Sequence, residues 1–419
     1  MISWLQDTLL RLNVTDTMEQ TQGFTRLGYT NDETSAMQAF TDIAFEIDLY
    51  VRTDEAGNKI ASWFPDSKVA SQRGALAMGS HLDTVERGGG YDGAAGVLCA
   101  LGAVKKLKGE GIKLNRPVEV ICFASEESAR FGVSTIGSKA MSGLLTTRLA
   151  DELKGVTDKH GTSIKEALES QGNSWDFVTE AVRPKEDIYR FIELHIEQGQ
   201  RVENAGADIG VVHAIACPIR LKIHLKGKAG HTGTTPMNSR RDAFATAAPL
   251  ISFIQQRAEE LSEGPNPVVA TVSTVEVLPN VMNVIPGDVL LGVDIRSVED
   301  SLKIQMEEEI RRKAEEIEQD TSIIINIEKL VDNPSVFLDA ETLDELRTAV
   351  QKTGLSSFNL ESGAGHDVMN MASKWKTGLL FIRCKDGLSH HPEEHVELKD
   401  LDYGVQALAA YVKQEAGAE

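Results

Sequence analysis

An apolar stretch that ends abruptly in a polar, glycine-rich loop is the feature that most constrains this chain. Residues 75–78 have the pattern of a buried strand, residues 79–96 form the loop, and residues 97–107 have the pattern of a helix. This succession predicts an open α/β sheet, in which ligands bind at the carboxyl ends of the parallel strands. The loop carries three side chains that suit a divalent transition metal: His81, Asp83 and Asp92.

The same loop also fits a nucleotide-binding pattern. Gly88, Gly90 and Gly93 follow a strand and precede a helix with the spacing G-x-G-x-x-G. A dinucleotide site needs an acidic residue at the end of a second strand about twenty residues further on, and Glu126 comes too late. A dinucleotide-binding oxidoreductase is therefore the disfavoured alternative, and we interpret the glycines as backbone that allows the loop to double back.

The length and charge of the chain limit its class. At 419 residues it is longer than one hydrophobic core usually supports, so two domains are expected. A net charge of −20 argues against nucleic acid or an anionic membrane as a partner, because both require a basic surface. We identify no signal peptide and no membrane-spanning run. The four scattered cysteines are typical of reduced thiols, and we expect a cytoplasmic protein.

Three more predicted strands lead into residues of the types that can bind metals. They are the strand at 118–124, followed by Glu126 and Glu127, the strand at 189–195, ending at His195, and the strand at 378–382, followed by His390. A glutamate pair usually lies on a solvated face, but this pair ends an apolar strand. We therefore expect these residues to meet the first loop at one edge of the sheet.

The pattern changes between residues 212 and 331. The strand at 220–226 alternates polar and apolar residues, unlike the buried strands before it. It is followed by a helix at 240–261, strands at 268–277 and 289–295, a helix at 302–317 and a strand at 323–330. This β-α-β-β-α-β order is ferredoxin-like. We therefore predict a mixed-sheet catalytic domain in two parts, 1–211 and 332–419, with an inserted α+β domain at 212–331.

The number of potential ligands favours two metal ions. Two ions a few ångströms apart need a carboxylate that spans both and further ligands for each. The expected set is a bridging Asp92, with His81 and His195 on one ion and Glu127 and His390 on the other. Asp83 is expected to accept the second ring proton of His81. Glu126 then stays free to act as a base beside a water. Zinc, manganese, cobalt and nickel all accept such ligands.

Seven motifs occur in order along the chain, at residues 79–85, 89–93, 126–132, 193–199, 231–237, 283–287 and 362–367. They resemble the hydantoinase/carbamoylase branch of the dinuclear-metal M20 family of aminoacylases and carboxypeptidases, over a region from about residue 23 to the C terminus. The resemblance implies the same five ligands, the general base at Glu126 and an orienting carboxylate at Asp83. A histidine at position 195 resembles this branch more than the peptidases of the family.

The resemblance also implies that the inserted domain is a lid and dimerisation domain of a homodimer. It implies substrate-binding residues at Gln198, Arg220, Asn283 and Arg296, and a lid histidine, His231, that reaches an active site across the dimer. Arg296 is chemically suited to this role, because a guanidinium binds a carboxylate through two parallel hydrogen bonds. The alternative for Arg296 is a solvated arginine at the end of a strand.

These features predict metal-dependent hydrolysis of the carbamoyl C–N bond of an N-carbamoyl-L-amino acid, giving the amino acid, ammonia and carbon dioxide. The expected partner is a small molecule with a carboxylate and a ureido or amide group. Allantoate amidohydrolase, β-ureidopropionase and other N-acyl amidohydrolases share this chemistry and stay as alternatives. A metal-holding module without catalysis is disfavoured, because Glu126 is not needed to bind metal.

Overall fold

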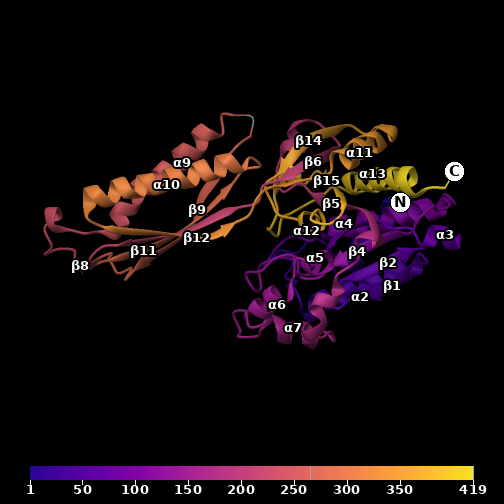
Figure 1. The fold of residues 1–419 in the computed structure, drawn as a ribbon, viewed down its shortest axis with the longest axis horizontal. Helices are drawn as coiled ribbons and strands as arrows, with labels where there is room; N and C mark the ends of the chain where they lie inside the picture. The colour runs from indigo at the N-terminus through magenta and orange to yellow at the C-terminus, as the bar shows by residue number, and fades with distance from the viewer. Residues whose placement is uncertain (265, 419) are drawn as a thin grey trace. The chain divides into compact units, whose positions relative to one another are not determined.

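The computed structural model describes residues 1–264 and 266–418, which form two compact units (Figure 1). Unit 1 comprises Met1–His213, Leu338–Leu360 and His366–Glu419, and unit 2 comprises Ala214–Phe337 and Glu361–Gly365. The boundary expected between residues 211 and 212 lies inside a strand. The short segment Glu361–Gly365 rejoins unit 2 after the chain has returned to unit 1.

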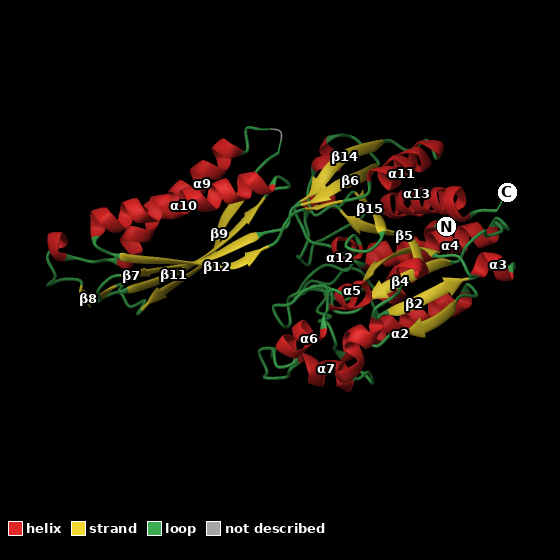
Figure 2. Cartoon of the chain, in the orientation of Figure 1, coloured by secondary structure: helices red, strands yellow, loops and turns green. Residues whose placement is uncertain are grey.

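A mixed sheet with the order β1-β2-β4-β3-β5-β15-β6-β13, with β14 paired to β6, contains the apolar strands predicted for the catalytic domain (Figure 2). Its strands are Tyr50–Thr53 (β1), Lys59–Trp63 (β2), Ala75–His81 (β3), Val118–Phe123 (β4), Ile188–Ile196 (β5), Ile209–Ile215 (β6), Val336–Phe337 (β13), Ser357–Ser362 (β14) and Lys376–Ile382 (β15). Strands β6, β13 and β14 were not predicted.

Four neighbouring strands, β4, β3, β5 and β15, run parallel to one another. Strands β3 and β4 are buried at every position, in agreement with their continuous apolar sequences. Helix α4, Ala94–Gly109, connects β3 to β4 and completes the strand-helix-strand unit expected from the sequence. Because these strands are parallel, the residues that follow each of them meet at one edge of the sheet.

The other helices of unit 1 pack around this sheet. They are Ile2–Leu12 (α1), Asn31–Glu46 (α2), Lys68–Ser71 (α3), Ile136–Ser142 (α5), Thr147–Leu153 (α6), Ile164–Ser170 (α7), Arg201–Asn204 (α8), Ala340–Lys352 (α11), Asp367–Met371 (α12) and Leu398–Ala416 (α13). Helix α4 contacts α1, α13 and strands β3 and β5. Among residues 1–264 and 266–418, none of the helices has the length and apolar character needed to span a membrane.

Unit 2 has the predicted β-α-β-β-α-β order. Its elements are Ile219–Lys226 (β7), Ala243–Leu261 (α9), Val269–Leu278 (β9), Asp288–Arg296 (β11), Asp300–Thr321 (α10) and Ile324–Asp332 (β12). The four strands form a separate antiparallel sheet in the order β12-β7-β11-β9. Alternate residues of β7 and β11 pack with α9 and α10 in one core. The predicted fold class, an α/β protein with an inserted ferredoxin-like unit, is therefore confirmed.

Candidate metal centre

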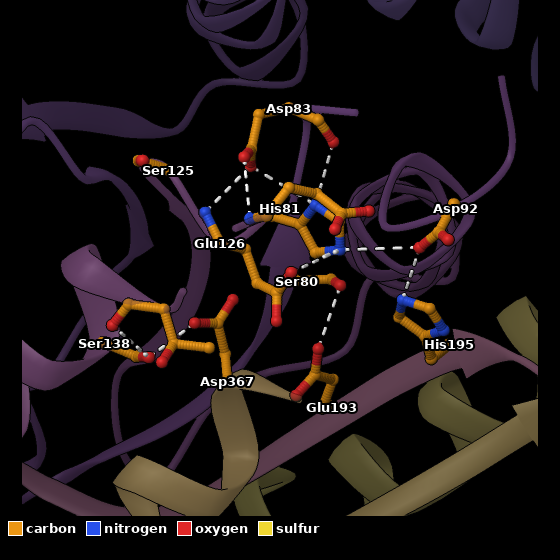
Figure 3. A network of polar contacts seen from close by, with 12 residues as sticks. Ser80, His81, Asp83, Asp92, Ser125, Glu126, Ser138, Glu193, His195 and Asp367 are labelled. Atoms are coloured by element: carbon orange, nitrogen blue, oxygen red, sulfur yellow. Dashed lines mark hydrogen bonds and ion pairs between the residues drawn. The ribbon is translucent and has the colours of Figure 1, made fainter. Parts of the chain in front are cut away.

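One carboxylate lies between two groups of potential metal ligands. Oδ1 of Asp92 is 2.9 Å from Nε2 of His195 and 3.6 Å from Nε2 of His81 (Figure 3). Oδ2 of the same side chain is 3.2 Å from Nε2 of His390, which lies 3.4 Å from Oε1 of Glu127. The ligand atoms within each group lie within 4.8 Å of one another. The structure thus brings the five expected ligands together, with Asp92 common to both groups.

The parallel strands account for this convergence. His81 is the last residue of β3, and His195 is the penultimate residue of β5. Glu127 follows β4, and His390 lies in the loop after β15. Asp92 lies in the loop between β3 and α4, opposite the two histidines from the strands. Four adjacent strand ends and one loop therefore supply the groups, as expected for a ligand site in such a sheet.

The hydrogen bonds of the two buried histidines fit a metal-binding role. Nδ1 of His81 lies 3.0 Å from the carbonyl oxygen of Asp83, and Nδ1 of His195 lies 3.0 Å from that of Ile196. With Nδ1 donating its proton to a carbonyl, Nε2 presents a lone pair toward Asp92. Neutral imidazoles around a shared carboxylate are a donor set that divalent transition metals accept.

The charges in the centre act on one another strongly. Burial by itself would raise the pKa of Asp92, but the histidines around it hold that pKa well below the usual range of an aspartate. Hydrogen bonds with Asp92 and Glu127 raise the pKa of His390 to about 10. Asp92 is therefore ionised, and a cation that binds between Asp92 and His390 would displace the proton that His390 otherwise holds.

Asp83 differs from the expected arrangement in how it contacts its neighbours. Its backbone carbonyl, rather than its carboxylate, makes the closest contact with the ring of His81, whose Nδ1 is 3.4 Å from Oδ1. The carboxylate accepts a hydrogen bond from the backbone N–H of Glu126, at 3.0 Å (Figure 3). It accepts another from the backbone N–H of Glu127, at 2.8 Å. Asp83 thus orients both the first histidine and the turn that carries the two glutamates.

Glu126 lies beside the centre but in neither ligand group. Its Oε2 is 3.9 Å from Nε2 of His81, and the residue is buried. Burial raises the pKa of the Glu126 carboxyl well above its ordinary value; Glu127 and Asp367 raise it further, while His81 opposes them. A buried carboxyl group with a raised pKa can accept a proton from a water near neutral pH.

No role was predicted for four buried residues around the ligands, although three of them lie in the motifs at 193–199 and 362–367: Glu193, His366, Asp367 and Glu394. Glu394 accepts hydrogen bonds from the backbone N–H groups of Tyr91 and Asp92, both at 2.9 Å. The ring of His366 lies 4.6 Å from that of His195. Glu193 stands in the middle of an apolar strand, and a charged residue in that position is itself a sign of a polar network. The sequence around Glu394 has no comparable feature that would indicate a buried polar network.

The glycines of the first loop pack closely against side chains. A Cβ atom on Gly93, whose φ is +64°, would lie 2.5 Å from the His81 ring. Side chains also fill the space at Gly89, next to Glu394, and at Gly90, next to Met18. This space is closed to a pyrophosphate, which needs open access to the backbone of such a loop. The loop instead doubles back and brings Asp92 close to His81, as we interpreted its glycines from the sequence.

Gln198 is the one expected substrate-binding residue in unit 1, and it lies at the metal centre. Its Nε2 donates to Oδ2 of Asp92, at 3.0 Å, and to Oγ of Ser389, at 3.2 Å. Ser389 also donates to Oδ2 of Asp92, at 2.9 Å. Two uncharged donors therefore orient the oxygen of Asp92 that faces His390.

The expected functional residues of unit 2 form two pairs. Arg220 and Arg296 both bond to the carboxylate of Asp294, at 2.8 and 2.7 Å from their Nε atoms. His231 ends β8, Gly230–His231, which pairs with β10, Val284–Ile285, and Asn283 directly precedes β10 and accepts a backbone hydrogen bond from Thr232. The ring of His231 accepts a hydrogen bond from the N–H of Gly233 at 3.0 Å, and the residue is exposed.

Sequence comparisons identify the family of the chain. The model of peptidase family M20/M25/M40 matches residues 77–414. An N-carbamoyl-L-amino acid amidohydrolase of Geobacillus stearothermophilus is 34% identical, and the alignment covers 95% of this chain and 94% of the relative. A ureidoglycolate hydrolase of Arabidopsis thaliana is 35% identical, over 92% of this chain and 80% of the relative. An allantoate deiminase of the same plant is 38% identical, over 80% of this chain and 68% of the relative. These identities establish the family and leave the substrate open.

A solved structure supports the same relationship. The amidase of the hydantoinase/carbamoylase family from Burkholderia multivorans aligns with a TM-score of 0.87 at 28% identity, over 99% of this chain and 98% of that one. The match therefore covers both units of the chain. With its fold, its two candidate ligand groups and its relatives, the chain belongs to the M20 family and is a metal-dependent amidohydrolase of the hydantoinase/carbamoylase branch.

Proposed function

We propose that the protein hydrolyses the carbamoyl C–N bond of N-carbamoyl-L-amino acids, giving the amino acid, ammonia and carbon dioxide. The observation that carries the proposal is the Asp92 carboxylate, which faces two histidines through one oxygen and His390 through the other, with Glu126 beside it. The bacterial relative named as an N-carbamoyl-L-amino acid amidohydrolase, similar over nearly its whole length, supports this choice of substrate.

The proposed ligands are His81, Asp92 and His195 for one ion and Asp92, Glu127 and His390 for the other. The ions are zinc, manganese, cobalt or nickel, which all bind such groups. When bound, they lower the pKa of a water and polarise the substrate carbonyl. The protein residues provide the remaining chemistry. Asp83 and Gln198 keep their contacts with the ligands and so hold the two groups in place.

Glu126 has the role of general base in this proposal. Its carboxylate takes a proton from the water that attacks the carbonyl carbon, and it then returns that proton to the nitrogen that leaves. Its burial and its place outside both ligand groups leave it available for the transfer. The products of a ureido substrate are then the free amine and a carbamate, which decomposes to ammonia and carbon dioxide.

The residues of unit 2 bind the substrate in this proposal. Arg296 and Arg220 are the carboxylate-binding residues, and the bonds that both make to Asp294 hold their guanidinium groups side by side. His231 stabilises the oxyanion and Asn283 contacts the substrate amide. We also propose that the protein is a homodimer, which the exposed position of His231 favours, and that it is cytoplasmic, as its buried free cysteines suggest.

Allantoate and ureidoglycolate are the competing substrates, since relatives named for them are 38% and 35% identical to this chain. A panel of N-carbamoyl-L-amino acids, allantoate, ureidoglycolate, β-ureidopropionate and N-formyl amino acids, tested with each metal restored to stripped protein, separates these functions. Highest kcat/KM for an N-carbamoyl-L-amino acid supports the proposal. Highest kcat/KM for any other compound contradicts it.

The role of Glu126 is tested with Glu126→Gln. This variant should keep its metal and lose about 10²- to 10⁴-fold in kcat, the range for a lost general base. Glu166→Gln is the matched control, because Glu166 lies in an exposed capping box at the start of α7. Near-normal turnover of Glu126→Gln would show that another group takes the proton.

A further inference from the structure

Three consecutive backbone N–H groups, in the turn that carries Glu126 and Glu127, donate hydrogen bonds to buried carboxylates. Those of Glu126 and Glu127 donate to Asp83, as described above. The third, of Ser125, donates to Oε1 of Glu33 at 2.8 Å. Glu33 comes from the first turn of α2, far from the turn in sequence, and is 3% exposed. No residue of the metal centre makes this contact with Ser125.

The backbone of Ser125 needs such support. Its φ is +51°, in the left-handed region that non-glycine residues rarely adopt, and this conformation turns the chain from β4 into Glu126. The packing there is close as well, because a Cβ atom on Gly28 would lie 2.3 Å from Oγ of Ser125. A hydrogen bond that fixes the Ser125 amide therefore selects the conformation that aims Glu126.

The position of Glu33 is itself well determined. Its second oxygen, Oε2, accepts a hydrogen bond from the N–H of Tyr29, just before α2, and Thr30 caps that helix. Burial and the neighbouring Asp83 raise the pKa of Glu33 to about 8, and the buried Arg26, which attracts both carboxylates, opposes this rise. One buried cation thus lies near the two carboxylates that hold the turn, which reduces the cost of burying them.

We propose that Glu33 is a positioning residue for Glu126, acting through the left-handed backbone of Ser125. The inference rests on the proposed role of Glu126 as the base. Glu33 lies outside residues 77–414, to which the family model extends, and it touches no proposed ligand. An N-terminal helix outside that region thereby contributes to the geometry of the proton transfer.

The test is Glu33→Gln. The amide keeps the size of the carboxylate, but its NH2 group must face either the Ser125 N–H or the Tyr29 N–H, so one of the two hydrogen bonds is lost. We expect kcat to fall about 10- to 100-fold with KM and metal content little changed, because misplacement of a catalytic group affects mainly the chemical step. Glu166→Gln is the control, with the same chemical change at the same helix position.

A second background tests the route through Ser125. Glycine adopts a left-handed backbone without a steric penalty, so Ser125→Gly makes the turn less dependent on Glu33. The factor by which Glu33→Gln lowers kcat should therefore be smaller in the Ser125→Gly background. A third measurement reports on the backbone of the turn and does not depend on enzyme activity. Hydrogen-deuterium exchange of peptides spanning residues 124–135 should quicken in Glu33→Gln and stay unchanged in Glu166→Gln.

The outcomes separate this inference from the proposed function. If Glu126→Gln stays active, the assignment of the base is wrong, whatever Glu33→Gln does. If Glu126→Gln is inactive while Glu33→Gln loses only thermal stability, with unaltered kcat and exchange, the positioning role is wrong. An equal loss of kcat in both Ser125 backgrounds would also overturn it, because Glu33 would then act by another route.

Discussion

Oδ2 of Asp92 lies 3.2 Å from Nε2 of His390, although in the sequence Asp92 precedes the inserted unit and His390 follows it. The other oxygen of Asp92 faces His195 and His81. A single carboxylate thus connects the ligand group that includes two buried histidines with the group that includes the half-exposed His390. The loss of this one side chain should affect both groups.

Asp92→Ala should therefore bind neither ion, whereas His390→Ala should retain the ion at His81 and His195. Metal analysis of dialysed protein and calorimetric titration of stripped protein measure the stoichiometry. His224→Ala is a suitable control, because His224 pairs with Asp288 in unit 2. Full metal content in Asp92→Ala would disprove a shared carboxylate.

Gly93→Ala should weaken metal binding about 10- to 100-fold, because the new methyl group would displace the His81 ring, and outer contacts of metal ligands have effects of this size. Gly132→Ala provides a matched control. Gly132 also has a positive φ, +71°, but has nothing within 4 Å of the added Cβ, so it loses only about 1 kcal/mol of stability through backbone strain. Equal metal affinities in the two variants would contradict the prediction.

The stability of the protein should depend on pH through Asp54, which lies in the turn between the antiparallel strands β1 and β2. Burial raises the pKa of this carboxyl from 3.8 to about 6, although Asn58 and Ala56 donate hydrogen bonds to it. The folded state therefore retains the proton of Asp54 more strongly than the unfolded state does. The resulting stabilisation is complete below pH 3.8 and is lost as the pH rises through about 6.

Urea unfolding of the wild type and of Asp54→Asn between pH 4 and 7 measures this effect, since asparagine does not titrate. The free energy of unfolding of the wild type should fall relative to that of the variant by up to about 3 kcal/mol across this range. Parallel pH profiles for the two proteins would show that folding does not raise the pKa of Asp54.

Arg296→Lys should raise KM about tenfold and change kcat less. Arg296 reaches Asp294 through Nε and donates from Nη1 to the carbonyl of Gly363, at 2.7 Å. A lysine ammonium cannot make this set of contacts and also offer two parallel donors to a substrate carboxylate. Arg311→Lys is the control, since Arg311 bonds to Glu307 within α10. Unchanged KM would exclude Arg296 from carboxylate binding.

The arrangement of the proposed ligands could be predicted because it follows from local signals. Each parallel strand is a short apolar run, and each run ends at a residue of metal-binding type, so the topology of the sheet brings His81, Glu127 and His195 to one edge. The ferredoxin-like unit was predictable for a similar reason, since the alternation in β7 and the heptad-like spacing in α10 are strong signals of exposed and buried faces.

The contacts that could not be predicted depend on backbone geometry or on distant partners. The Asp83 carboxylate lies 3.4 Å from the His81 ring, but it also accepts hydrogen bonds from the N–H groups of Glu126 and Glu127, which follow the left-handed Ser125. Glu394 bonds to the backbone of Asp92, and Glu33 to that of Ser125, from segments with no motif of their own. Strand β13 has only two residues, too few to show periodicity.

The position of β15 has a consequence for how the molecule forms. This strand lies between β5 and β6, which precede it in the chain, and it is synthesised only after the whole of unit 2. Until it arrives, a growing polypeptide carries two strands with open edges where its neighbour belongs, and such edges invite pairing with other chains. Late synthesis of one buried strand thus makes the nascent protein most vulnerable to aggregation shortly before its active site can assemble.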